Sequence, residues 1–159
     1  MAVRDFGKLL LAVVVCLLAG YGGSIFTTSS ISTWYRALEK PAFTPPSWVF
    51  APVWTILYIM MGVAAYLVWR QGLSKGTVRV ALVMFLAQLA LNTLWSFLFF
   101  GLRSPSLGLL SIVTLWVAIV LTVAYFARVA WVAALLLLPY LLWVTFASLL
   151  NYTIWRLNL

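Results

Sequence analysis

Residues 104–127 read SPSLGLLSIVTLWVAIVLTVAYFA and form a stretch without a charged side chain. Arg103 and Arg128 bound it on either side. An α-helix rises about 1.5 Å per residue, so about 20 apolar residues cross a hydrocarbon core about 30 Å thick. The stretch is therefore predicted to be a membrane-spanning helix.

Four further charge-free intervals predict four more spans. They cover residues 9–35, 41–69, 80–102 and 129–155, and each holds at least 23 residues. The intervals are apolar throughout, whereas the strands of a membrane barrel alternate lipid-facing and lumen-facing residues. We therefore expect an all-α membrane protein with one domain, residues 1–159, built as a bundle of five transmembrane helices. The expected spans are residues 7–28, 47–70, 77–101, 105–127 and 130–155.

The composition excludes an ordinary water-soluble globule. Of 159 residues, 66% are hydrophobic and 8% are charged, against about 45–50% and about 25% in soluble domains. The net charge of +8 comes from 10 Lys and Arg against 2 Asp and Glu. The basic residues are spread between the apolar runs and do not cluster. They indicate membrane-flanking charge and no nucleic-acid partner.

The basic residues also predict the orientation in the membrane. Six of them fall on the amino-terminal side of the expected bundle, namely Arg4, Lys8, Arg70, Lys75, Arg79 and Arg128. Four fall on the other side, namely Arg36, Lys40, Arg103 and Arg156. Six against four favours a cytoplasmic amino terminus. The first span has no A-x-A-like cleavage site, so we expect it to remain as a helix and not to be removed as a signal peptide.

The residue types offer little for conventional catalysis. The chain has no His, its two carboxylates are expected in loops, and Cys16 is the only thiol. No catalytic residue of the acid–base or nucleophilic kind and no metal site is therefore expected, and haem held by an axial His is excluded. Proton-coupled transport is disfavoured because relays place Asp, Glu or His at membrane depth. Facilitated passage of a ligand stays open.

The long connection at residues 29–46, called the lid below, is predicted to be structured. Ser32 is expected to cap a short turn over residues 34–39, and the prolines at 41, 45 and 46 prevent further helix. Trp34, Tyr35 and Phe43 make the segment aromatic, which is not typical of a solvated linker. We expect the lid to lie against one end of the bundle.

Three of the expected spans carry a face of aromatic and amide residues at helical spacing. The faces are Trp54, Tyr58, Met61 and Ala65 on the second span, Gln88, Asn92 and Trp95 on the third, and Tyr140, Trp143, Ala147 and Asn151 on the fifth. Amides at membrane depth either bond neighbouring helices or face a ligand. Trp48, Trp69, Trp131 and Trp155 fall near span ends, as in an interfacial belt. Trp116 and Trp143 lie near mid-span, and Pro139 is expected to kink the fifth span.

Several spaced motifs resemble one known family. They are WYRALEKP at residues 34–41, PPSWVF at 45–50, WTILY at 54–58, Gln88 with Asn92 and Trp95, LPYLLW at 138–143 and LNYTIWRLN at 150–158. Together they resemble the translocator protein family, also called tryptophan-rich sensory proteins or peripheral-type benzodiazepine receptors. The resemblance covers residues 34–158.

The resemblance implies a five-helix membrane protein, commonly dimeric, with a ligand pocket under the first long loop. Ligands of the family include tetrapyrroles such as protoporphyrin IX and haem, sterols, and benzodiazepine-like drugs. Combined with the helix faces, it implies the ligand-binding set Trp34, Tyr35, Pro41, Phe50, Trp54, Tyr58, Gln88, Asn92, Trp95, Tyr140, Trp143 and Ala147. Leu150, Tyr152 and Arg156 match a proposed sterol motif, which is a weak pattern by itself.

The expected function is that of a membrane receptor that binds tetrapyrroles and requires no cofactor. Two alternatives stay open: a facilitator that moves porphyrins across the bilayer, and light-dependent degradation of porphyrin that uses Trp54 and Trp143. Membrane lipid or sterol and a second copy of the chain are the expected partners. Cys16, Gly20 and Ser24 form a small-residue ladder that suits close packing within the bundle or between chains. The third span offers only scattered Ala81, Ala87 and Ala90 for a dimer contact.

Overall fold

The computed structural model describes residues 3–159, with side chains from Asp5 onward, and this part of the chain is helical without strands. Five long helices are α1 (Val3–Ile31), α3 (Ser47–Trp69), α4 (Gly76–Ser96), α5 (Pro105–Val129) and α6 (Trp131–Leu157). A π-helical turn, η1 (Phe97–Gly101), continues α4, and the short α2 (Trp34–Ala37) lies in the lid. Each of the five, with η1 counted as part of α4, is long and apolar enough to cross a membrane. The predicted bundle of five spans is therefore confirmed.

Three local predictions are wrong at the ends of elements. The first span was expected to end near residue 28, but α1 continues to Ile31. Ser30 Oγ donates to the Phe100 carbonyl at 2.8 Å, which ties the last turn of α1 to η1. Ser32 therefore lies in the turn between two helices, and the N-cap of α2 is Thr33, without a side-chain bond. Asp5 is in the first turn of α1 and not in a loop, where the helix dipole favours a carboxylate.

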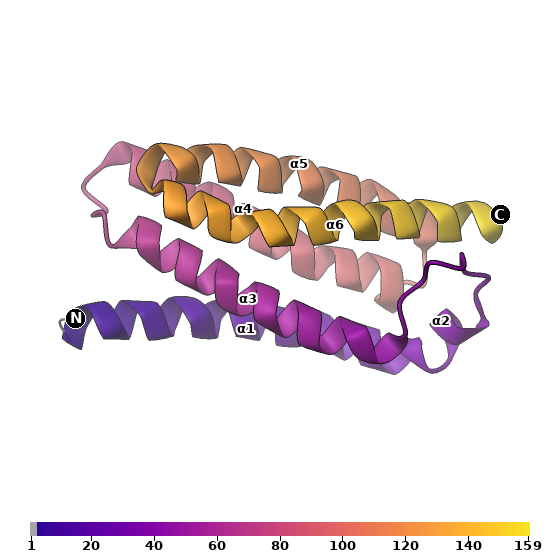
Figure 1. The fold of residues 1–159 in the computed structure, drawn as a ribbon. Coiled ribbons are helices and arrows are strands. Elements are labelled where there is room, and N and C mark those ends of the chain that lie inside the picture. The colour runs from indigo at the N-terminus through magenta and orange to yellow at the C-terminus, as the bar shows by residue number, and fades with distance from the viewer. Residues whose placement is uncertain (1–2) are drawn as a thin grey trace.

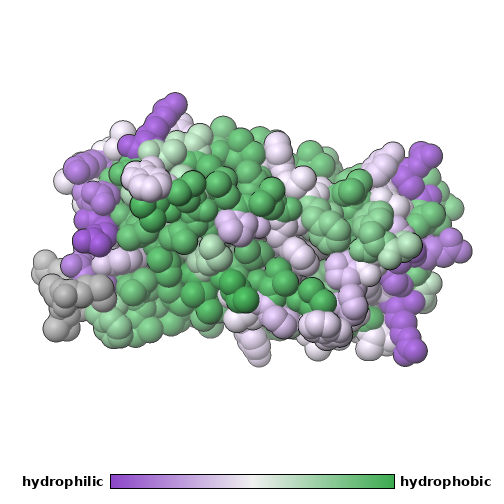
Figure 2. All heavy atoms as spheres, in the orientation of Figure 1, coloured by the Kyte–Doolittle hydropathy of each residue, from purple (hydrophilic) through white to green (hydrophobic). Residues whose placement is uncertain are grey.

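The five long helices run along one axis and form a single bundle (Figure 1). α5 packs against both α4 and α6, and α1 packs against α3. The two ends of the chain lie at opposite ends of the bundle, and the lid with α2 lies at the carboxyl-terminal end. In Figure 2 a broad hydrophobic band separates hydrophilic side chains at the two ends, as expected of a bundle that crosses a bilayer.

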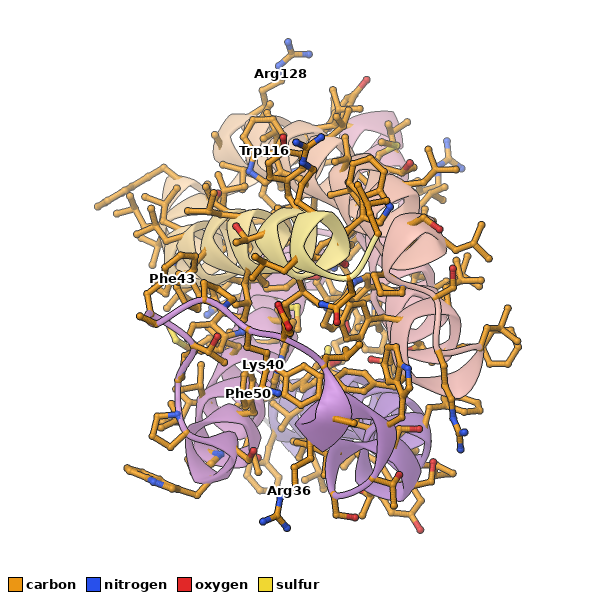
Figure 3. The ribbon with its side chains drawn as sticks, turned by 90° about the vertical axis from the view of Figure 1, so that its right-hand side faces the viewer. Arg36, Lys40, Phe43, Phe50, Trp116 and Arg128 are labelled. Atoms are coloured by element: carbon orange, nitrogen blue, oxygen red, sulfur yellow. The ribbon has the colours of Figure 1, made fainter. Side chains whose placement is uncertain are left out.

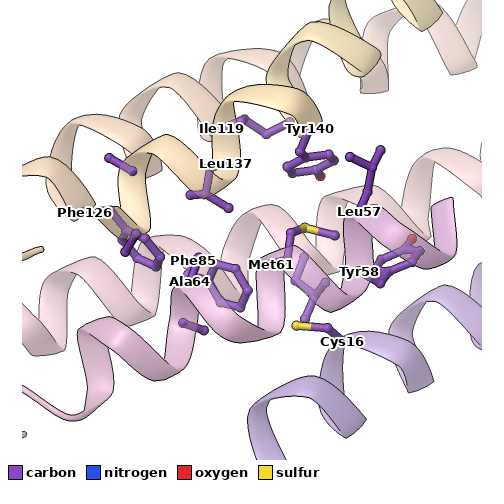
Figure 4. Packing of buried hydrophobic residues seen from close by; sticks show 14 of the residues in the cluster. Cys16, Leu57, Tyr58, Met61, Ala64, Phe85, Ile119, Phe126, Leu137 and Tyr140 are labelled. Atoms are coloured by element: carbon purple, nitrogen blue, oxygen red, sulfur yellow. The ribbon is translucent and has the colours of Figure 1, made fainter. Parts of the chain in front are cut away.

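Close packing of α1 on α3 depends on glycine. A Cβ at Gly62 would lie 2.5 Å from the Cα of Val13, and a Cβ at Gly20 would overlap the ring of Tyr58. Cys16 is buried in the same contact, near Met61 and Tyr58 (Figure 4). Two members of the predicted small-residue ladder, Cys16 and Gly20, thus pack within the chain.

α5 begins with a clear local signal, whereas α6 begins after Ala130 without a side-chain cap. Ser104 caps α5 by accepting the Leu107 N–H at 3.3 Å, and Pro105 occupies the first turn, where its missing donor costs nothing. α6 stays helical on both sides of Pro139. These two helices bring the residues of the fifth-span face toward α3 and α4, which forms the inner wall of the site.

Candidate functional site

A large cavity lies between α1 and α3 at the lid end and measures about 520 Å³. Pockets for small organic ligands range from about 300 to 1,000 Å³. On one side it is lined from α1 by Leu17, Gly20, Tyr21, Ser24, Thr27, Thr28 and Ile31. On the other side it is lined by Ser47, Phe50, Ala51, Trp54, Thr55 and Tyr58 of α3. Tyr35 of α2 with Trp95, Ser96 and Phe100 completes the lining.

A second cavity of about 30 Å³ lies beside the first, deeper toward α6. Its lining adds Phe99, Trp143, Ala147, Leu150, Asn151 and Ile154. Five aromatic residues line both cavities: Tyr35, Phe50, Trp54, Trp95 and Phe100. They come from α2, α3, α4 and η1, and they form a wall of rings between the two spaces, which we call the aromatic wall.

The rings of the aromatic wall pack on one another and on their neighbours. Trp54 lies 6.4 Å from Trp95 between ring centroids, in a tilted arrangement. Trp95 stacks on Phe99 at 5.8 Å, and Phe50 meets Trp143 edge-on at 6.1 Å. Offset and edge-to-face pairs at such distances add about 0.5–1.5 kcal/mol each beyond the area they bury. The wall therefore offers preformed flat surfaces to a ligand.

A buried polar network lies behind the aromatic wall. Tyr140 donates to Gln88 Oε1 at 2.8 Å and accepts from Asn92 Nδ2 at 2.9 Å, while the Tyr58 hydroxyl donates to Asn92 Oδ1. Both amides thereby bond helices α3, α4 and α6 together, as polar residues at membrane depth must. Trp54 packs on Tyr58 and Tyr140 at centroid distances of 5.6 and 6.2 Å. The network holds the rings that support Trp54.

Trp95 and Trp143, which both line the small cavity, differ in their hydrogen bonding. Trp95 Nε1 donates to Asn151 Oδ1 at 3.2 Å, and Asn151 Nδ2 donates to the carbonyl of Pro105 at 2.8 Å. Trp143 Nε1 is buried and has no partner within the described part of the chain. An unpaired buried donor costs about 1–3 kcal/mol. Trp143 can therefore donate to an acceptor that enters the small cavity.

The lid closes the cavities at the end of the bundle. Tyr35 belongs to the lid and is buried against the bundle. Its burial raises the pKa of the phenol to about 12. Lys40 Nζ donates to the carbonyls of Tyr35, Arg36 and Leu38 at 2.7–3.2 Å, which ends α2. In Figure 3, Lys40 of the lid is turned toward the bundle, whereas Arg36 points away from it.

The carboxyl-terminal end of α6 holds the lid in place. Asn158 accepts the Glu39 N–H at 3.0 Å and donates to the Glu39 carbonyl at 2.9 Å, so one amide binds both backbone groups. Phe43 packs edge-on against Phe146 at 6.2 Å. The prolines restrict the backbone between these contacts. No role was predicted for Asn158, because it lies 119 residues from Glu39 and no sequence pattern connects the two.

The structure brings seven of the twelve expected ligand-binding residues to the cavities. Tyr35, Phe50, Trp54, Tyr58 and Trp95 line the large one, and Trp143 and Ala147 line the small one. Trp34, Pro41, Gln88, Asn92 and Tyr140 line neither. Trp34 instead packs on Phe99 at 5.5 Å, as part of the lid.

Sequence reasoning missed two contributors to the site. The first is the carboxyl-terminal half of α1, whose hydroxyl residues look like the frayed end of a helix. The second is η1, where a π-helical turn places Phe99 and Phe100 against the cavities. π-Helical turns occur often at functional sites, and the aromatic sequence FLFF at residues 97–100 is the one available signal.

The residues of the expected sterol motif do not share one surface. Leu150 is buried and lines the small cavity, whereas Tyr152 is exposed and packs near Trp155. Arg156 is exposed at the end of α6. A sterol on the lipid-facing side would therefore contact Tyr152 and Arg156 without Leu150.

The remaining tryptophans have separate roles. Trp48 and Trp131 are 75% and 67% exposed near helix starts, where an interfacial belt is expected. Trp116, near mid-span, donates from Nε1 to the Thr145 hydroxyl at 2.8 Å and so joins α5 to α6. Over the described residues, no group of three or more His, Cys, Asp and Glu could hold a metal ion.

Comparison with known proteins places the chain among relatives of one kind. The model of the TspO/MBR family matches residues 12–156. A "Tryptophan-rich protein TspO" of Chlorobaculum tepidum is 53% identical over 150 residues, which is 94% of this chain and 95% of the relative. The human "Translocator protein" is 41% identical over 138 residues, 86% and 81% of the two chains. A "Tryptophan-rich sensory protein" of Cereibacter sphaeroides is 40% identical over 126 residues, 79% and 77% of the two chains.

Proposed function

This chain belongs to the TspO/MBR family of multi-pass integral membrane proteins, and on that premise we propose that it is a membrane receptor that binds tetrapyrroles such as protoporphyrin IX or haem. The proposed site is the lid-side cavity with its aromatic wall. The sensory or regulatory role that the family supports would then depend on occupancy of this cavity.

The aromatic wall is the observation that carries the proposal. Five rings from four elements border a cavity of about 520 Å³, and a flat conjugated macrocycle buries the most apolar area when rings cover its faces. Among the described residues, no charged side chain lines either cavity. The ring of the ligand would therefore be buried, and its carboxylates would stay at the rim, where water reaches them.

The same cavity extends the proposal to other flat or amphipathic molecules. Benzodiazepine-like drugs are smaller than a porphyrin and suit the same rings, and sterols or lipids would approach from the bilayer side. A homodimer is a further proposal. Ala87 and Ala90 are exposed on α4, whereas Ala81 is buried, so a second copy could approach closely only along the exposed pair.

Titration of the purified protein with protoporphyrin IX in lipid nanodiscs tests the proposal. The expected result is saturable quenching of tryptophan fluorescence, because Trp54 and Trp95 would lie beside the macrocycle. Empty nanodiscs give the partition background. Quenching that rises linearly with porphyrin, as it does for partition into lipid alone, would contradict the proposal.

Light-dependent degradation is a second candidate, and one observation favours it. Trp54 lines both cavities, and Trp143 lines the small one and packs edge-on against Phe50, so a porphyrin in the large cavity would lie beside the Trp54 indole, with Trp143 directly behind the aromatic wall. An excited porphyrin can oxidise a neighbouring indole or react with oxygen without an acid–base catalyst. Facilitated transport is tested separately, by porphyrin flux into sealed vesicles.

A further inference from the structure

The large cavity opens sideways, toward the bilayer. Several of its lining residues are exposed on the outer surface of the bundle: Tyr21, Ser24 and Thr28 on α1, and Ala51 and Thr55 on α3. Tyr21 is 68% exposed. These residues belong to membrane-spanning helices. Because both helices are long and apolar enough to cross a membrane, we expect the opening between α1 and α3, called the side opening below, to face lipid.

α1 and α3 pack tightly at one end of their contact and border the cavity toward the lid. They are in tight contact where Gly62 meets Val13, and the Tyr58 ring fills the space at Gly20. From Gly20 toward the lid, the facing residues of α1 and α3 line the cavity. From Ser47 to Tyr58 is 11 residues, or about 16 Å of helix. The side opening thus spans about half of a hydrocarbon core about 30 Å thick.

The lid leaves no comparable route. Asn158 binds both backbone groups of Glu39, and Lys40 is bound by three carbonyls. Tyr35 is 5% exposed and packs against Phe99 and Phe100. Entry through the lid would require these contacts to break, whereas entry from the side passes only lipid-facing residues.

The side chains at the side opening suit the passage of an amphipathic ligand. Ser24, Thr28 and Thr55 donate their hydroxyl protons to carbonyls of their own helices at 2.6–2.8 Å. Their oxygens can still accept a hydrogen bond, but no donor is left unpaired when the ligand passes. The opening is therefore mildly polar and carries no charge that lipid would have to solvate.

We propose that the ligand reaches the cavity from the lid-side half of the bilayer, through the side opening between α1 and α3. The proposal rests on the proposed function, because it assumes that a tetrapyrrole dissolved in the membrane is the ligand. It makes the lid a fixed roof and the bilayer the reservoir from which the site is filled.

Bulk at the side opening provides the test. Ala51→Phe adds a ring at an exposed position of the opening, and Ala124→Phe places the same ring at an exposed position of α5, away from both cavities. Neither change adds a tryptophan, so tryptophan quenching by protoporphyrin IX in nanodiscs remains the readout. Stopped-flow mixing gives the association rate, and transfer to excess vesicles gives the dissociation rate.

An obstructed route slows passage both ways. We expect Ala51→Phe to associate and dissociate about tenfold more slowly than wild type, whereas simple damage to the site would speed dissociation, and Ala124→Phe should match wild type. Ser24→Phe, on the opposite wall, repeats the test if Ala51→Phe does not fold. Wild-type association rates in the variants at the opening, or faster association only when Asn158→Ala releases the lid, would overturn the proposal. Wild-type protein without saturable quenching would instead overturn the proposed function.

Discussion

At the scale of single residues, the tryptophans divide by what their rings touch. Trp54, Trp95 and Trp143 line cavities, Trp116 bonds two helices, and Trp131 is exposed near the start of α6. Composition alone would treat all of them as one tryptophan-rich signature. Only the first group is expected to change ligand binding.

Loss of a cavity tryptophan should weaken porphyrin binding. Trp95→Ala and Trp143→Ala each remove a ring whose contacts are worth about 0.5–1.5 kcal/mol beyond buried area, so we expect Kd to rise at least several-fold. The shift of the porphyrin absorbance band serves as readout, since both variants lose a fluorophore. Trp131→Ala is the matched control and should bind as wild type does. Unchanged titrations in both folded cavity variants would remove them from the site.

Light separates the receptor from the photochemical enzyme. Dark conversion of bound porphyrin is not expected, because among the described residues no His, carboxylate or thiol lines either cavity. Under illumination, a distinct product that disappears in Trp54→Phe and Trp143→Phe would support degradation, and bleaching identical to that of free porphyrin would support binding alone. Product analysis by mass spectrometry makes the distinction. Conversion in darkness would contradict the chemical argument.

The sequence predicted the inner half of the site better than the outer half. Helical spacing puts Trp54 and Tyr58 on one face and Trp143 and Ala147 on another, and these faces do meet at the cavities. Spacing could not show that the side-chain oxygens of Gln88 and Asn92 accept hydrogen bonds from tyrosine hydroxyls. Whether an amide meets a hydroxyl or a ligand depends on the neighbouring helix, which the spacing of one span does not contain.

At the scale of elements, the lid is the segment most sensitive to occupancy. Arg36 offers a trypsin site in it, whereas the bond after Lys40 leads to Pro41 and resists trypsin. A ligand against the aromatic wall would contact Tyr35 and reduce the local opening that cleavage requires. We therefore expect slower cleavage after Arg36 once protoporphyrin IX is bound, measured by mass spectrometry of the fragments. Equal cleavage at saturating ligand would mean that the lid does not sense the cavity.

The tight contact between α1 and α3 gives a prediction about stability. In Gly62→Ala the new methyl group would lie 2.5 Å from the Val13 Cα, and such overpacking costs about 1–3 kcal/mol. We expect a lower thermal midpoint in detergent, followed by circular dichroism. Gly7→Ala is the control, because a Cβ there meets nothing within 4 Å. A Gly62→Ala variant as stable as wild type would contradict the tight crossing.

Element ends show why local patterns mislead. Proline and serine signals at residues 29–46 predicted a structured lid, and α2 with its contacts bears this out. The same signals placed a cap at Ser32, because serine is a strong N-cap on statistics alone. The structure continues α1 to Ile31 instead, because the bond from Ser30 to the Phe100 carbonyl holds that end against η1.

At the scale of the whole molecule, the charge-free intervals were sufficient to predict five spans. This works because a bilayer leaves few choices: backbone groups must bond internally, and charges must stay at the surfaces. How the helices pack was not predictable in the same way. The contact of α1 with α3, the side opening and the bond between Asn158 and Glu39 join residues far apart in the sequence, and no periodicity records them.

The central claim is that a tetrapyrrole binds in the lid-side cavity against the aromatic wall, and a structure of the protoporphyrin IX complex in a lipid environment tests it most directly. The account predicts density for the macrocycle between α1 and α3 beneath the lid, with Trp54 and Trp95 along the ring and the carboxylates toward the rim. Density for the macrocycle on the outer surface of the bundle, with the cavity empty and the aromatic wall unchanged, would contradict the account.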